Sequence, residues 1–143
     1  MALSAMESIR IDALAAGIWA TIRNFDALQD WHPAVAKSPA DKANAEGSVR
    51  RLSLHGGGEV VETLERHDDS RMSYTYTSAD GSALPVAGYR STITVSPDGA
   101  GARVEWRGEF SAAPGVKDDA AVQGMRGVYR AGLDNLKRLH ERG

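Results

Sequence analysis

Hydrophobic and polar positions alternate with two different periods along the chain, and each change of period marks a predicted element. Polar and apolar residues alternate over residues 8–12, with Ile9 and Ile11 on one side, which predicts a short strand with one buried face. Asp12 has a side chain that can cap a helix, so a helix is predicted to begin there. Its apolar residues recur every three or four positions and share one face: Leu14, Ile18, Ile22 and Phe25.

A second, shorter helix is predicted directly after the first. Asp26 is its expected cap, and Leu28 and Trp31 are its apolar residues. Pro33 ends this helix, because its ring lacks a backbone donor and forces the preceding residue toward extended geometry. The stretch Ala34–Glu46 has no hydrophobic periodicity and is predicted to be a surface loop.

Five strands are predicted in the middle of the chain. Segments rich in Gly, Asp, Ser and Pro separate several of them, at residues 55–58, 68–70 and 97–101, and this composition is typical of turns. The spacing of the segments is typical of an antiparallel sheet. The predicted strands are Ser48–Leu54, Glu59–His67, Met72–Ser78, Val86–Ser96 and Arg103–Ala112.

The last predicted element is a long helix that begins at Asp118 or Asp119. Acidic residues at its start and Lys137 and Arg138 near its end match the polarity that the helix dipole favours. At about 100° per residue one face is apolar and must be buried. That face consists of Val122, Met125, Tyr129, Leu133 and Leu136.

Three glycines interrupt this helix, although glycine weakens helices. Gly132 falls near the buried face, where it could leave room for a ligand. Gly124 and Gly127 fall away from that face and could allow close contact with a second chain, which makes a homodimer one interpretation. Tolerance without any function is the other interpretation for all three.

The order of elements is strand, two helices, five strands and a long helix. It predicts an α+β fold in which a curved antiparallel sheet wraps around the last helix and the early helices close one edge. The chain has 143 residues, of which 42% are hydrophobic, so a single domain over residues 1–143 with a substantial core is expected.

Composition excludes several classes of function. The chain has 17 basic and 19 acidic residues, so its net charge of −2 gives no basic surface for nucleic acid or an anionic membrane. The absence of cysteine excludes disulfides, thiolate catalysis and cysteine-ligated metals. The four histidines lack metal-ligand spacing, and neither a metal nor a cofactor is predicted. No signal peptide or run of about 18 apolar residues occurs, so a cytoplasmic protein without membrane insertion is expected.

Period-two alternation sorts each predicted strand into an inward and an outward face. Most inward positions are aromatic or aliphatic, among them Tyr74, Tyr76, Tyr89, Trp106 and Phe110. Two inward positions are charged: Arg50 and Glu62, on strands joined by a turn. A charge in an apolar interior is costly unless it is paired or solvated, so the two are predicted to form an ion pair. The pair either locks the two strands together or contacts a ligand directly.

The sequence Trp31-His32-Pro33 allows two interpretations. Trp31 either packs in the core at the end of the second helix, or it lies with His32 beside the entrance of a cavity and contacts a ligand. The tyrosines likewise either pack in the core or orient a ligand with their hydroxyls.

These elements together resemble the helix-grip fold of the START-like or SRPBCC superfamily, and in particular its polyketide cyclase/dehydratase-like branch. The resemblance covers nearly the whole chain. The motifs that carry it are residues 25–33 (FDALQDWHP), 47–52 (GSVRRL), 60–64 (VVETL), 74–76 (YTY), 85–90 (PVAGYR) and 129–133 (YRAGL). The resemblance implies a deep cavity between the sheet and the long helix that holds a small hydrophobic or amphipathic molecule. It does not imply a reaction, because the superfamily has no shared catalytic constellation.

Three functions remain open from the sequence. The first is binding of a small, largely apolar ligand, with Arg50 anchoring an oxygen and Glu62 holding Arg50 or accepting a hydroxyl. The second is a cyclase or dehydratase-like enzyme in which Glu62 moves a proton and Arg50 or a tyrosine stabilises an enolate. The third is a co-chaperone-like interaction module, against which the polar outer face argues. The candidate site residues are Arg50, Glu62, Tyr74, Tyr76, Tyr89, Trp106, Trp31, His32 and Tyr129.

Overall fold

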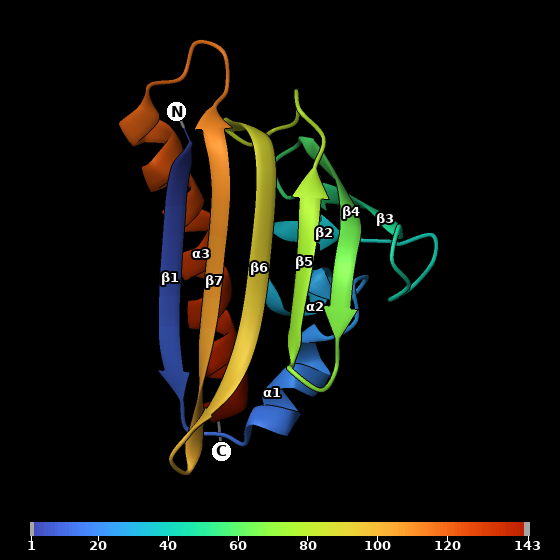
Figure 1. The fold of residues 1–143 in the computed structure, drawn as a ribbon, viewed down its shortest axis with the longest axis vertical. Helices are drawn as coiled ribbons and strands as arrows, with labels where there is room; N and C mark the ends of the chain where they lie inside the picture. Colours follow the sequence, from blue (N-terminus) through green and yellow to red (C-terminus); the bar gives the residue numbers. More distant parts are fainter. Residues whose placement is uncertain (1, 142–143) are drawn as a thin grey trace.

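A computed structural model describes residues 2–141 as one seven-stranded antiparallel sheet with a long helix across one face (Figure 1). The strand order is β1-β7-β6-β5-β4-β3-β2. The elements are β1 (Leu3–Ile11), α1 (Ala15–Ile22), α2 (Leu28–Trp31), β2 (Val35–Lys37), β3 (Val49–Leu54), β4 (Glu59–Asp68), β5 (Ser73–Ser78), β6 (Val86–Asp98), β7 (Gly101–Ala112) and α3 (Asp118–Glu141). This arrangement confirms the predicted fold class.

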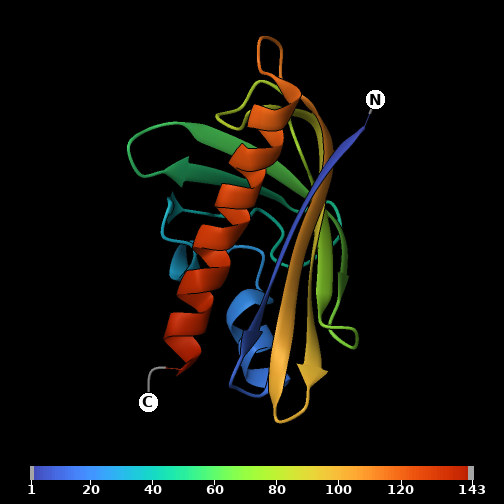
Figure 2. The same cartoon turned by 90° about the vertical axis from the view of Figure 1, so that its left-hand side faces the viewer.

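The sheet curves around α3, which runs diagonally across its concave side (Figure 2). Helices α1 and α2 lie on the same side as α3, with α2 behind β5 and β4 and α1 beside the lower ends of β6 and β7 in the view of Figure 1. The core therefore lies between the inner face of the sheet and the three helices.

The inward faces of the strands are those that alternation predicted. In β7 the buried residues Val104, Trp106 and Phe110 alternate with the exposed Arg103 and Arg107. In α3 the buried face includes four of the five predicted residues, while Val122 is only half-buried. The buried residues of this face are Ala121, Met125, Tyr129, Gly132, Leu133 and Leu136.

The first strand is longer than predicted. Residues 3–11 all pair with β7, from Leu3 opposite Phe110 to Ile11 opposite Ala102. Residues 3–7 lack a clear alternation of hydrophobic and polar residues, so the strand there follows from pairing with β7 and not from a local pattern.

The predicted helix caps were wrong. Helix α1 begins at Ala15 after Leu14, and α2 begins at Leu28 after Ala27, with no side-chain hydrogen bond at either cap. The Asp12 carboxylate instead accepts from Arg10. Leu14, which was predicted on the buried face of the first helix, is 75% exposed because the helix starts one residue after it.

The predicted loop 34–46 contains the edge strand β2, which pairs with β3 from Val35 opposite Leu54. Three residues are too few to show alternation, so only the pairing with β3 reveals this strand. Met72, predicted as an inward strand residue, lies before β5 with a φ of 51° and is half-buried. No helix within residues 2–141 is long and apolar enough to cross a bilayer.

Candidate functional site

Arg50 and Glu62 form a buried ion pair on the inner face of the sheet, between β3 and β4, toward the edge formed by β2. They are directly opposite each other in the β3–β4 register. The Arg50 Nε atom donates a hydrogen bond of 2.8 Å to Glu62 Oε1, and Nη2 lies 2.7 Å from the same oxygen. Arg50 is 0% exposed and Glu62 is 3% exposed. The predicted ion pair is therefore present, and it joins two neighbouring strands.

Protein groups surround the rest of the Arg50 guanidinium. Its Nη1 atom donates to the Phe25 carbonyl at 3.0 Å and lies 3.4 Å from the Tyr74 hydroxyl. The guanidinium carbon lies 4.1 Å from the centre of the Phe25 ring and 4.9 Å from that of Tyr76, which is cation–π geometry. Arg50 Nε and Nη1 thus have hydrogen-bond partners inside the core, whereas the buried Nη2 has only its ion-pair contact with Glu62 among residues 2–141.

Burial and pairing act in opposite directions on the two pKa values. Burial alone would lower the pKa of Arg50, but the Glu62 carboxylate and the neighbouring tyrosines raise it above its usual value. Burial raises the pKa of Glu62, and Arg50 limits that rise by favouring the carboxylate. Since an arginine in a protein stays protonated, a neutral pair requires an ionised Glu62.

A chain of hydroxyl groups continues from the ion pair toward α3. The Tyr89 and Tyr129 hydroxyls are 2.5 Å apart, and those of Tyr76 and Tyr89 are 3.4 Å apart. The indole N–H of Trp106 lies 3.2 Å from the Tyr76 hydroxyl and 3.1 Å from the Ser91 hydroxyl, and can donate to both. Burial raises the pKa of Tyr129 to about 12 and those of Tyr76 and Tyr89 well above their usual value, so all three phenols are neutral.

Gly108 of β7 makes room for this chain of hydroxyls. A Cβ atom at Gly108 would overlap the Tyr129 hydroxyl and would lie 2.9 Å from the Tyr89 ring. The close approach of the two phenols to the sheet therefore requires glycine at this position.

His32 connects the end of α2 with α3. Its Nε2 atom lies 2.8 Å from the Val128 carbonyl, and its Nδ1 atom accepts from the Ala34 backbone N–H at 3.1 Å. The carbonyl needs a donor and the N–H needs an acceptor, so the ring is neutral with its proton on Nε2. Burial lowers the pKa of His32, and the nearby Arg50 charge adds to that shift despite the Val128 hydrogen bond.

A cavity of about 90 Å³ lies between the sheet and α3. Its wall is formed mainly by apolar side chains, with Glu62, His32 and two tyrosines as its polar members. Ala34, Leu54, Leu84 and Val128 are half-buried or exposed, so they form the mouth of the cavity. The buried residues Leu28, His32, Val35, Leu52, Val60, Glu62, Tyr76, Tyr89, Trp106 and Met125 complete the wall.

Five of the nine candidate residues line this cavity: His32, Glu62, Tyr76, Tyr89 and Trp106. The other four do not line it but pack behind those that do. They are Arg50, Tyr74, Trp31 and Tyr129, all of them buried.

The sequence did not indicate that the residues at the mouth lie together, although alternation places Leu54 on the same inward face as Arg50 and Leu52. Leu54, Leu84 and Val128 are ordinary apolar residues at the ends of strands, in a loop and on a helix. Only the curvature of the sheet places them together. No pattern of hydrophobic positions could have indicated this.

Gly132 does not leave room for a ligand. A Cβ atom there would lie 2.7 Å from His32 Cδ2, 2.9 Å from the Trp106 ring and 3.0 Å from the Trp31 ring. Aromatic side chains of the protein itself fill the space above Gly132. Of the two interpretations of this glycine, space for a ligand was therefore wrong.

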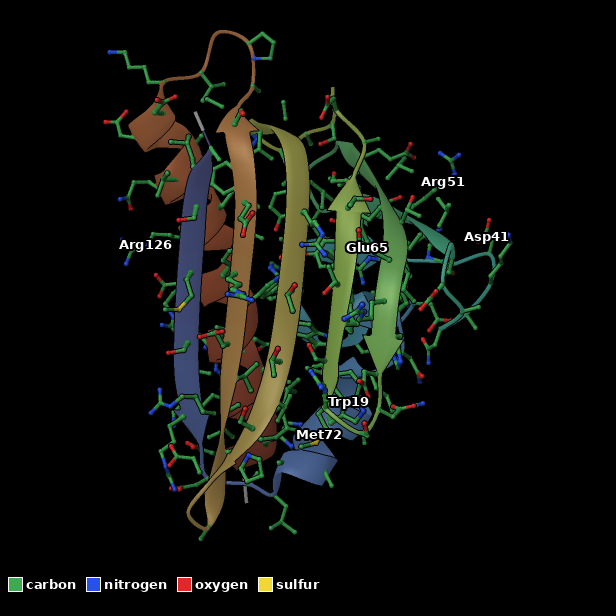
Figure 3. All side chains as sticks on the ribbon, viewed as in Figure 1. Trp19, Asp41, Arg51, Glu65, Met72 and Arg126 are labelled. Carbon is green, nitrogen blue, oxygen red and sulfur yellow. The ribbon has the colours of Figure 1, made fainter. Side chains whose placement is uncertain are left out.

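The outer face of the sheet is polar. Glu65, labelled in Figure 3, pairs with Arg90 across the sheet at 2.6 Å. Two hollows on this face, of about 370 and 690 Å³, are larger than the inner cavity, but charged and hydroxyl side chains make up most of their walls. Apolar ligands favour apolar walls, so we take the inner cavity as the candidate site.

Among residues 2–141 no group of three or more histidine or carboxylate side chains is placed to hold a metal ion.

Comparison with known proteins agrees with this geometry. The family model described as "Polyketide cyclase / dehydrase and lipid transport" matches residues 2–141. The chain belongs to this family. This membership confirms the resemblance that the sequence motifs indicated.

Individual relatives are distant in sequence. MLP-like protein 423 of Arabidopsis thaliana is 29% identical over 107 residues, a match that covers 71% of this chain and 66% of that protein, just under two thirds of its length. The structure of XoxI from Bacillus cereus is 29% identical, with a TM-score of 0.87 over 96% of this chain and 94% of that one. Truncated norcoclaurine synthase from Thalictrum flavum has a TM-score of 0.79 over 100% and 96% of the two chains, but at 18% identity this similarity shows the fold alone.

Proposed function

We propose that this protein binds a small, largely apolar molecule in the cavity between the sheet and α3. The observation that carries the proposal is the cavity itself, whose apolar wall surrounds a few polar groups. This combination is typical of sites for small molecules, because the apolar wall supplies affinity and the polar groups supply orientation. Membership of a family whose description includes lipid transport supports the proposal.

The size of the cavity limits its occupant. Pockets for drug-sized ligands usually measure about 300–1,000 Å³, whereas an engineered apolar cavity of about 150 Å³ binds benzene. A cavity of about 90 Å³ fits a group smaller than a drug-sized ligand. A larger ligand requires the apolar side chains at the mouth to move apart.

Toluene is a suitable first probe, because it has no polar group and matches the apolar wall. Toluene is larger than the cavity of about 90 Å³, so its binding also requires the apolar side chains at the mouth to move apart. In protein with ¹³C-labelled methyl groups, toluene should shift the signals of Leu52, Val60 and Val128 and leave those of the outer face unchanged. Absence of any shift at these methyl groups up to saturating toluene would contradict the proposal.

Two neighbouring residues of β4 provide a matched pair of variants. Val60 is buried in the cavity wall, whereas Val61 is half-buried on the opposite face of the strand. Val60→Phe should fill the cavity and abolish toluene binding, while Val61→Phe should bind toluene as the unchanged protein does. Circular dichroism checks that both variants fold, because an overpacked core loses about 1–3 kcal/mol of stability.

One observation favours a second function, that of an enzyme with cyclase or dehydratase-like activity. Glu62 faces the cavity, and burial raises its pKa, which are properties of a general acid or base. Arg50 opposes this role because it stabilises the carboxylate. If a compound that co-purifies with the protein is converted by it, and Glu62→Gln retains binding but loses conversion, the enzyme is supported.

A further inference from the structure

The charged group that faces the cavity is an anion, although a cation lies directly behind it. Glu62 belongs to the wall, whereas Arg50 does not. The Arg50 pairing uses Glu62 Oε1, and among residues 2–141 no hydrogen bond reaches the second oxygen, Oε2. The cavity therefore contains a carboxylate oxygen that can accept a hydrogen bond from a ligand.

The ring nitrogens of the side chains that line the cavity already have hydrogen-bond partners within the protein. Both ring nitrogens of His32 have backbone partners, and the Trp106 N–H donates to hydroxyl oxygens. The remaining polar groups of the wall are the Tyr76 and Tyr89 hydroxyls. The Tyr89 and Tyr129 hydroxyls are 2.5 Å apart, and either can be the donor, whereas the Tyr76 hydroxyl lies 3.4 Å from that of Tyr89 and near the Ser91 hydroxyl. The wall thus offers one strong acceptor, Glu62, and phenol hydroxyls as donors, of which Tyr76 has no short hydrogen bond to another phenol.

Charge restricts the ligand further. Arg50 and Glu62 together are neutral, and both are almost completely buried. A ligand carboxylate would approach the Glu62 carboxylate inside an apolar wall, where repulsion between like charges is weakly screened. A ligand ammonium would leave a net positive charge in the same surroundings, with no further carboxylate in the wall to balance it.

We propose that the cavity selects neutral apolar molecules with a hydroxyl group, whose proton is donated to Glu62 Oε2. This inference rests on the proposed function and specifies the chemical class of its ligand. A hydroxyl matches the wall because the same oxygen can donate to Glu62 and accept from Tyr76. Carboxylic acids in their ionised form are excluded by the same geometry.

Four probes with the same ring test this selectivity: toluene, benzyl alcohol, benzoate and benzylamine, titrated into the unchanged protein at neutral pH. Methyl chemical shifts give the dissociation constants. A hydrogen bond to a charged acceptor should make benzyl alcohol bind about tenfold more tightly than toluene. Benzoate and benzylamine should bind at least about tenfold more weakly than benzyl alcohol, because each brings an uncompensated charge.

The outcomes separate this inference from the proposed function. If toluene binds in the cavity but benzoate binds as tightly as benzyl alcohol, or the alcohol gains nothing over toluene, the inference is overturned and the binding function stands. If no probe binds, both are overturned. Because the comparison uses only the unchanged protein, it does not depend on any variant folding.

Two substitutions, each of which removes one negative charge, test whether Glu62 causes the preference among the four probes. Glu62→Gln should remove most of the preference for benzyl alcohol over toluene and strengthen benzoate binding several-fold, because the repelling charge is gone. Glu65→Gln, three residues along β4 on the outer face, should leave the ranking of the four probes unchanged. A Glu62→Gln protein that folds and keeps the original ranking would contradict the assignment to Glu62.

Discussion

Neighbouring groups determine the charge state and the hydrogen bonds of single residues in this core. The Arg50–Glu62 pair shows this most clearly. Replacing one member of a buried pair typically costs about 3–5 kcal/mol, because the other charge is left unpaired. The pair therefore holds β3 against β4, and the cavity receives only the oxygen that the pairing does not use.

His32 gives the clearest prediction at this scale. Its pKa is lowered from 6.5, so the folded state disfavours the proton that the unfolded chain accepts. The stabilisation from a neutral His32 is complete above about pH 6.5 and is lost as pH falls toward the lowered pKa, with a slope of up to about 1.4 kcal/mol per pH unit. Urea denaturation from about pH 7.5 to about pH 5 should show this loss, and His32→Gln should reduce the slope.

His140 provides the control for this measurement, because burial also lowers its pKa. Within residues 2–141 its one hydrogen bond is with the Thr21 hydroxyl, at 2.8 Å, and it is less buried than His32. His140→Gln should therefore reduce the slope less than His32→Gln does. Equal slopes for the unchanged protein and His32→Gln would show that His32 is not held neutral by the fold.

The sequence was sufficient to predict which residues point inward, but not where each lies relative to the cavity. Alternation placed Arg50 and Glu62 on one face, and the β3–β4 register then made them partners. Whether Arg50 or Glu62 faces the cavity depends on how Phe25 and Tyr74 surround the guanidinium. Those contacts join residues far apart in the chain, so no local pattern reveals them.

Among the elements, the packing of α3 against the sheet depends on a glycine, Gly132. Gly132 lies on the buried face of α3, where Trp31, His32 and Trp106 approach the helix backbone. The ring of His32 can reach the Val128 carbonyl one turn earlier because no side chain occupies position 132.

Gly132→Ala should therefore destabilise the protein by about 1–3 kcal/mol, because three aromatic side chains must move to admit the Cβ atom. This loss should exceed the gain of about 1 kcal/mol that alanine gives a helix interior. Gly127→Ala is the control: nothing lies within 4 Å of its Cβ position, so it should stabilise by about 0.5–1 kcal/mol. Urea denaturation measures both, and a Gly132→Ala protein as stable as Gly127→Ala would refute the packing described here.

Elements with a long, regular pattern were predicted well from sequence, and short or edge elements were not. The 24 residues of α3 carry several turns of apolar spacing, and its start at Asp118 was confirmed. The three residues of β2 exist as a strand only because β3 provides hydrogen-bond partners. The start of α1 was misplaced because the Asp12 carboxylate pairs with Arg10 instead of capping a helix.

At the scale of the whole molecule, the curvature of the sheet creates the cavity. Residues of β3, the β5–β6 loop and α3 border its opening: Leu54, Leu84 and Val128. Much of the inner space is filled by aromatic rings, which is why the cavity measures only about 90 Å³. The family resemblance implied a deep cavity, but it could not predict how far these rings fill it.

A crystal structure of the protein with benzyl alcohol would show whether the cavity binds a hydroxyl-bearing ligand. We expect a single molecule inside the cavity, its ring against Leu52, Val60 and Val128, and its hydroxyl oxygen about 2.7 Å from Glu62 Oε2. An empty cavity, or benzyl alcohol bound only on the outer face of the sheet, would contradict this expectation.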